Sequence, residues 1–257
     1  MILKPTRFLL LFLFFLPQLV VAQRKTHNDV ELWPELQADY VLGEKGFIYF
    51  RNQYRITTNS DLETLYRKQF QLGYEHMFNE NWSGGLSERA ALETNRNKFF
   101  TELFFRHQGH IGSVRFIKRG AFEYIHISDM DAASRFRLRA ELDREFKVKE
   151  LGIRPRVSYE IFLLSSLTGE NPENQRRIDR TRLRLDVTFE ISDHFSVTPF
   201  FTKQTDYLET IEQYDENGNI KIPGGNLNEI TPIFGLETRL ILFKDDPHRN
   251  RFRSYTK

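Results

Sequence analysis

Polar and apolar residues alternate along most of the chain. In RFRLRAELDREF (135–146), the odd positions up to Glu145 are all charged, and the even positions are apolar apart from Arg144. A period of two places the apolar side chains on one face of a β-strand, whereas the helical period would scatter them around the axis. This stretch therefore predicts a strand with one apolar face and one charged face.

The same alternation recurs from end to end and predicts an all-β protein. It is clear at 29–42, 48–56, 67–78, 153–163, 180–191 and 229–242. Four stretches of similar length alternate less regularly, at 82–93, 99–111, 114–127 and 195–207. No convincing amphipathic helix follows the N-terminal leader. The count is about 11 strands, within a range of 10–12.

Short and long polar links alternate between these strands. The short ones lie at 43–46, 79–81, 112, 149–152 and 192–194, and the long ones at 58–64, 94–98, 128–133, 165–177 and 208–228. This is the plan of an antiparallel up-and-down β-barrel of outer-membrane type, with short periplasmic turns and longer outer loops. Within 208–228, Asn217-Gly218 is expected to turn a further hairpin.

In such a barrel the apolar face contacts lipid and the charged face lines the lumen. Aromatic residues also gather beside the short turns, as a girdle at the headgroup level would. They are Tyr40, Phe47, Tyr49, Phe78, Trp82, Phe146, Phe189 and Phe195.

The first 22 residues predict a secretory signal peptide. Lys4 and Arg7 precede an apolar run, and Val20-Val21-Ala22 provides small residues for cleavage after Ala22. Residues 23–243 are then the barrel domain and 244–257 a polar C-terminal tail. The expected location is the cell outer membrane. The chain has no cysteine, so the exported fold is stable without disulfides.

The leader carries two of the 37 basic residues and none of the 35 acidic ones, so the remainder is balanced at 35 against 35. A neutral exported chain does not favour a nucleic-acid partner. The expected partners are outer-membrane lipid and, during biogenesis, the barrel assembly machinery. The sequence does not fix the oligomeric state.

The candidate functional residues are charged side chains on the lumen face of three neighbouring strands. A hairpin turning near Glu150 pairs Asp143 with Arg156, and the next strand pairs Arg156 with Asp186. In this register Glu160 lies between Arg139 and Arg182. The predicted charge ladder, structural or pore-lining, is Arg137, Arg139, Glu141, Asp143, Glu145, Arg154, Arg156, Glu160, Arg180, Arg182, Arg184 and Asp186.

Several stretches resemble a known family. They are Trp33, FRNQYR (50–55), QLGYEHMFNENW (71–82), YEIF (159–162), RTRLRLD (180–186) and FGLETRLILF (234–243). Over essentially the whole mature chain, the sequence is similar to an uncharacterised, domain-of-unknown-function family of exported β-barrel proteins of Gram-negative bacteria. This resemblance implies an outer-membrane-type barrel and supplies no reaction, ligand or catalytic residue.

The sequence contains no phosphate-binding loop, dinucleotide fingerprint or helical zinc motif, so we assign no catalytic residue, cofactor or metal. The expected role is a narrow channel, a structural barrel or an interaction platform. One alternative is a soluble periplasmic barrel that holds a small apolar ligand in an apolar lumen. Another is a membrane-embedded hydrolase, for which His110 with Ser113 nearby is a candidate pair that lacks a third partner.

Overall fold

In the computed structural model, the chain is described over residues 24–243, apart from 44, 60–61, 95, 129, 166–177, 211, 216–218 and 223. The predicted signal peptide and C-terminal tail lie outside this part of the chain. Within it, eleven strands close into a barrel, as the sequence predicted. They are β2 (Val30–Val41), β3 (Gly46–Asn59), β4 (Leu62–Met77), β5 (Trp82–Glu93), β6 (Lys98–Ile111), β7 (Val114–Ile127), β8 (Ala133–Asp143), β10 (Leu151–Ser165), β11 (Ile178–Glu190), β12 (Phe195–Thr210) and β15 (Gly225–Phe243).

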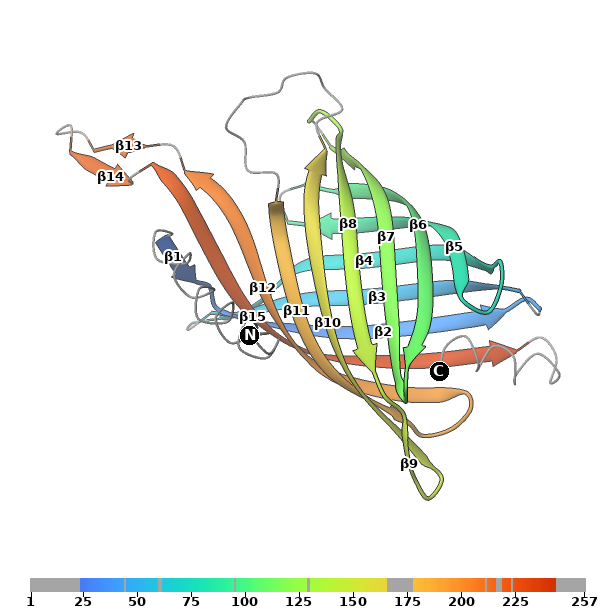
Figure 1. Ribbon diagram of the computed structural model, residues 1–257. Helices are drawn as coiled ribbons and strands as arrows, with labels where there is room; N and C mark the ends of the chain where they lie inside the picture. Colours follow the sequence, from blue (N-terminus) through green and yellow to red (C-terminus); the bar gives the residue numbers. More distant parts are fainter. Residues whose placement is uncertain are drawn as a thin grey trace, which may run out of the picture.

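The barrel closes between its first and last strands, β2 and β15, which run parallel (Figure 1). The other neighbouring strands of the wall pair antiparallel, in chain order. The predicted antiparallel up-and-down barrel is thus confirmed, with a parallel pair at this seam. The reason is the odd number of strands. Because consecutive strands alternate in direction, the first and the last strand of an odd set point the same way and pair in parallel. The short strand β1 (Arg24–His27) continues this parallel pairing along β15.

The two ends of the barrel differ, and we call them the short-turn end and the long-loop end. The short-turn end carries tight links, together with β9 (Phe146–Val148), which pairs with β10 and lengthens that hairpin beyond the rim. The long-loop end carries the hairpin of β13 (Gln213–Tyr214) and β14 (Ile220–Ile222), predicted around Asn217-Gly218, which projects beyond the wall (Figure 1). The long loop predicted at 58–64 is wrong, because β3 and β4 stay paired from Thr57–Thr64 to Asn59–Leu62.

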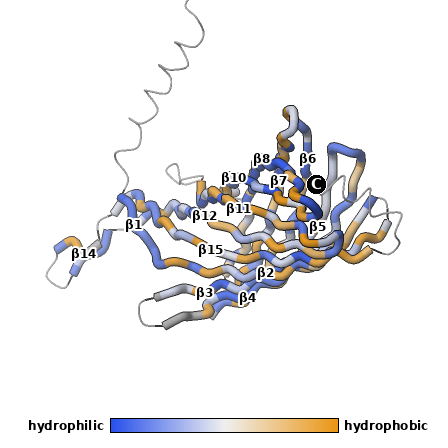
Figure 2. Tube along the Cα trace, turned by 90° about the horizontal axis from the view of Figure 1, so that it is seen from below, coloured by the Kyte–Doolittle hydropathy of each residue, from blue (hydrophilic) through white to orange (hydrophobic). Residues whose placement is uncertain are grey.

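The wall has an apolar outer face and a polar inner face. Leu185 on the outer face is 49% exposed, whereas its neighbour Asp186 on the inner face is 5% exposed. Orange and blue segments alternate accordingly along the strands in Figure 2. A soluble barrel with an apolar lumen would need the opposite arrangement, so that alternative does not fit the structure.

The described residues include no helix long and apolar enough to cross a membrane.

Three glycines on the inner face make room for aromatic rings from the neighbouring strand. Tyr49 pairs with Gly73, Phe104 with Gly85 and Phe200 with Gly235. A Cβ atom at Gly235 would lie 2.1 Å from Cζ of Phe200 and 2.5 Å from the carbonyl oxygen of Trp33. These glycines therefore let bulky rings lie flat against the wall and fill the lumen.

We expect Gly235→Ala to destabilise the folded barrel by about 1–3 kcal/mol, because the new methyl group overlaps both a ring and the backbone. The matched control is Gly120→Ala on the outer face, where the nearest atom to the added Cβ is Cδ2 of Leu138 at 3.9 Å. Denaturant unfolding of both variants measures the difference. Equal stability of the two would show that the Phe200 ring can move aside at no cost.

Candidate functional site: the charged lumen

The predicted charge ladder has the register that the sequence indicated. In the strand register, Asp143 lies opposite Arg156 and Glu160 lies opposite Arg139. On the next strand, Asp186 lies opposite Arg156. The Arg156 Nε donates to Asp186 at 2.9 Å. The ladder residues thus face one another inside the barrel.

Glu123 of β7 is a fully enclosed carboxylate of the network. It is 0% exposed and accepts hydrogen bonds from Arg89, Arg135 and Arg137 at 2.7, 2.5 and 2.7 Å. Arg89 makes no other ion pair with a described carboxylate. A buried carboxylate held by three guanidinium groups fixes β5, β7 and β8 relative to one another.

Arg137 of β8 connects this centre to the rest of the lumen. Besides Glu123, it donates to Glu160 of β10 at 2.6 Å and to Glu102 of β6 at 2.9 Å. Glu102 also accepts from Arg119 at 2.6 Å. One arginine therefore links carboxylates from three strands.

A second group of ion pairs lies by the closing seam. Arg184 bridges Asp186 and Glu237 at 2.9 and 3.0 Å, and Arg239 of β15 pairs with Asp39 of β2. The last of these pairs spans the parallel junction of the first and last strands. Ion pairing therefore continues around the lumen and across the seam.

Two arginines, Arg55 and Arg182, have no carboxylate within close hydrogen-bond distance among the described residues, and both lie against the ring of Trp33. The Arg55 guanidinium is 3.9 Å from the centre of the indole ring, and that of Arg182 is 5.3 Å from it. Arg182 is also 4.9 Å from the ring of Phe162, on β10. Since Trp33 belongs to β2, this stack of two rings and two guanidinium groups spans the lumen from β2 to β10.

A cavity of about 300 Å³ remains inside the barrel. Its lining runs from Ser192 and Asp193, in the turn between β11 and β12, to the stack around Trp33. We call this cavity the vestibule, and its lining extends from the short-turn end to the Trp33 stack.

The chain matches a known protein family. The family described as a protein of unknown function (DUF2490) matches residues 30–215. The chain belongs to this family. The match starts at the first residue of β2 and ends before β15, so the DUF2490 region contains every barrel strand except the closing one. This confirms the resemblance to a domain-of-unknown-function family. No curated protein matches the chain significantly.

The remaining predicted residues of this DUF2490 protein are placed as follows. Glu145 lies at the break between β8 and β9, 3.6 Å from Arg154, which also pairs with Glu190. Asp143 pairs with Arg115 at 2.9 Å. Arg180 pairs with Asp206, and Arg139 with Glu141 at 3.0 Å. His110 is exposed at the end of β6 and makes no hydrogen bond to Ser113 among the described residues.

Sequence reasoning missed more than half of the residues that form ion pairs in the described part of the chain. The missed members lie mainly on β2, β5, β6, β7 and β15, and include Glu35, Asp39, Arg89, Glu102, Arg119, Glu123, Glu237 and Arg239. In β6 and β7 the inner face also carries Phe100, Phe104 and Ile117, which blur the alternation. The sequence did contain a signal for two of the missed members. Glu102 and Glu123 each precede a residue of the outer face, Leu103 and Tyr124, so the period of two places both carboxylates on the inner face.

Proposed function

We propose that this protein is an outer-membrane β-barrel that does not conduct ions and that acts as a structural barrel and docking platform. The observation that carries the proposal is the combination of an apolar outer face with an interior closed by ion pairs and stacked rings. A polar interior and a lipid-facing apolar belt are the pattern of transmembrane barrels.

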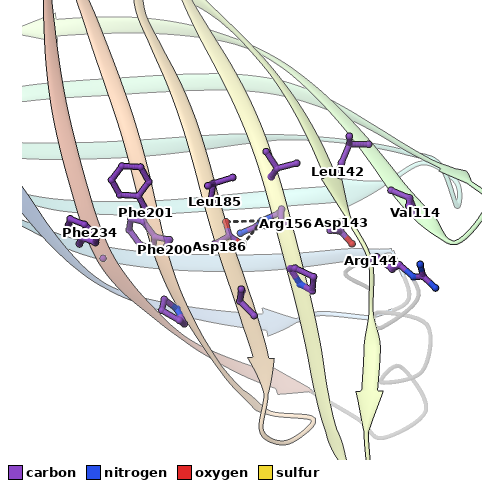
Figure 3. Close-up of a pocket in the computed structure, with 15 residues that line it drawn as sticks. Val114, Leu142, Asp143, Arg144, Arg156, Leu185, Asp186, Phe200, Phe201 and Phe234 are labelled. Carbon is purple, nitrogen blue, oxygen red and sulfur yellow. Dashed lines mark hydrogen bonds and ion pairs between the residues drawn. The ribbon is translucent and has the colours of Figure 1, made fainter.

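The outer face supports the membrane part of the proposal. It carries a hollow of about 760 Å³ across β8, β10, β11, β12 and β15, bordered by Leu142, Leu185, Phe201 and Phe234 (Figure 3). The Arg156–Asp186 pair lies in the same wall and is drawn dashed in Figure 3. We propose that lipid acyl chains fill this hollow, since exposing so large an apolar surface to water is unfavourable.

A few charged residues interrupt the apolar belt. Lys68, Lys118 and Lys203 are exposed, and a lysine side chain is long enough to place its ammonium group at a polar interface. Glu88 accepts a hydrogen bond from Thr101 at 3.0 Å. These positions are compatible with a lipid-facing belt because each charged group either can extend to the polar interface or has a polar partner.

The blocked lumen supports a role other than transport. Toward the long loops, the lumen beyond the Trp33 stack is lined by the ion pairs Arg67–Glu93 and Arg180–Asp206. The surface available to a partner is then the long-loop end, where the ends of β12 and β15 and the β13–β14 hairpin extend past the wall.

Fractionation followed by electrophoresis and conductance measurements tests the proposal. We expect the protein in the outer-membrane pellet, with a gel mobility that changes on boiling, and no unitary conductance steps in planar bilayers. Recovery in the soluble periplasmic fraction would refute membrane residence. Regular conductance steps from a boiling-sensitive protein would instead refute the closed lumen.

A further inference from the structure

We infer that the closed end of the vestibule binds a small oxyanion, of the phosphate or carboxylate class, between Arg55 and Arg182. This inference goes beyond the structural role proposed above. It rests on cationic groups at the wall of an internal cavity that the ion-pair network leaves without a close carboxylate.

Arg55 is the strongest indication. It is 6% exposed and makes no ion pair with any described carboxylate. Its Nε donates to the amide oxygen of Gln53 at 3.1 Å, and its guanidinium lies over Trp33. A buried cation with only a neutral acceptor and a ring face is costly unless an anion completes its environment.

Arg182 provides a second cation on the same indole ring. Its single ion pair within the described chain is to Glu160 at 3.9 Å, and Glu160 is already held by Arg137 at 2.6 Å. Its Nε donates to the neutral Gln204 at 2.8 Å. Two guanidinium groups on one ring repel each other, and an anion between them would remove that repulsion.

The other groups around this point complete the site. Gln69 is 6% exposed, lines the cavity and makes no side-chain hydrogen bond within the described chain, so its amide is available to an anion. The nearby Glu31 does not compete for the arginines by direct contact. Its carboxylate accepts from Trp33 Nε1 and from the Tyr66 hydroxyl, both at 2.7 Å.

The ligand is a free solute, because a lipid headgroup would draw its acyl chains into a cavity walled by charged and amide side chains. Arginine holds oxyanions through paired N–H donors, which makes phosphate a suitable probe. The solute enters from the short-turn end, since the lining of the vestibule reaches the turn at Ser192 and Asp193.

The experiment uses Trp33 as its own reporter. The chain has two tryptophans, and Trp82 lies on the outer face against His107, so Trp82→Phe leaves Trp33 as the single indole. Phosphate is titrated into the folded, boiling-sensitive protein in detergent, with sodium chloride added to keep the ionic strength constant. We expect a saturable change in Trp33 emission.

In the same background, Arg55→Gln and Arg182→Gln should each weaken phosphate binding at least about tenfold. Arg144→Gln should leave it unchanged, because Arg144 is exposed outside the lumen and lies over Phe146. Arg55→Gln removes a cation without separating an ion pair, so it should still fold and show the boiling-dependent mobility.

A linear response that chloride reproduces, or an unaltered phosphate affinity in folded Arg55→Gln, would overturn the inference. Either result would leave the closed barrel intact, since boiling sensitivity and the absence of conductance are measured separately.

Discussion

Replacing Glu123 by glutamine should destabilise the barrel by about 3–5 kcal/mol, the cost of removing one partner from a buried ion pair. The change keeps the shape of the side chain but removes the charge shared by Arg89, Arg135 and Arg137. Arg89 would lose its ion pair altogether, while Arg137 keeps Glu102 and Glu160. The free energy of unfolding in denaturant, for protein folded into lipid vesicles, measures the effect.

The matched control is Glu150→Gln, which removes the same charge from an exposed position in the turn between β9 and β10. We expect a change within about 0.5 kcal/mol, as for other surface substitutions. If Glu123→Gln were as mild as its control, the lumen would be hydrated well enough to solvate the guanidinium groups that Glu123 no longer neutralises. The ion pairs would then not be what closes the barrel.

Replacing Leu138 by arginine should cost about 2–4 kcal/mol of stability in a bilayer, because a charge at the centre of a lipid-facing strand enters the hydrocarbon region. Leu138 is 51% exposed on the outer face in the middle of β8, with Gly120 and Ile161 beside it on the neighbouring strands. For a water-soluble barrel the same change would be close to neutral. Folding efficiency and unfolding free energy in vesicles report the difference.

Ile111→Arg is the control for depth, since Ile111 is also exposed on the outer face but is the last residue of β6 at the short-turn end. Its cost should be about 0–1 kcal/mol, as is usual near the interface. Equal, small effects at both positions would contradict the lipid-facing belt.

The period-two pattern was sufficient to predict the barrel because each strand has one buried and one exposed face. It also indicated the register of β8, β10 and β11, where charged side chains occupy alternate positions and the pairing places Asp143 and Asp186 opposite Arg156. The parallel seam follows from strand parity, which depends on an accurate count. The loop at 58–64 was misjudged because polar residues such as Thr57 and Thr64 extend the paired strands past the apolar belt.

The candidate site was predictable only in part, for a geometric reason. Pairs between adjacent strands, such as Arg156–Asp186, follow from register. Contacts across the lumen do not, because they depend on how the sheet closes. Trp33 shows the difference: β2 and β11 are far apart in the sequence, yet Arg182 lies 5.3 Å from the indole ring. The inward aromatic rings above the glycines were missed because alternation alone assigns Phe and Tyr to the apolar face.

The parallel seam between β2 and β15 has a topographical consequence. Because the chain crosses the wall eleven times, Arg24 lies at the rim that bears the long loops and Phe243 lies at the opposite rim. In an even-stranded barrel both ends would emerge on one side of the bilayer. With the barrel in the outer membrane, as proposed, epitopes fused next to these two residues would be displayed in different compartments. Protease or antibody added to intact cells would reach one of them and not the other.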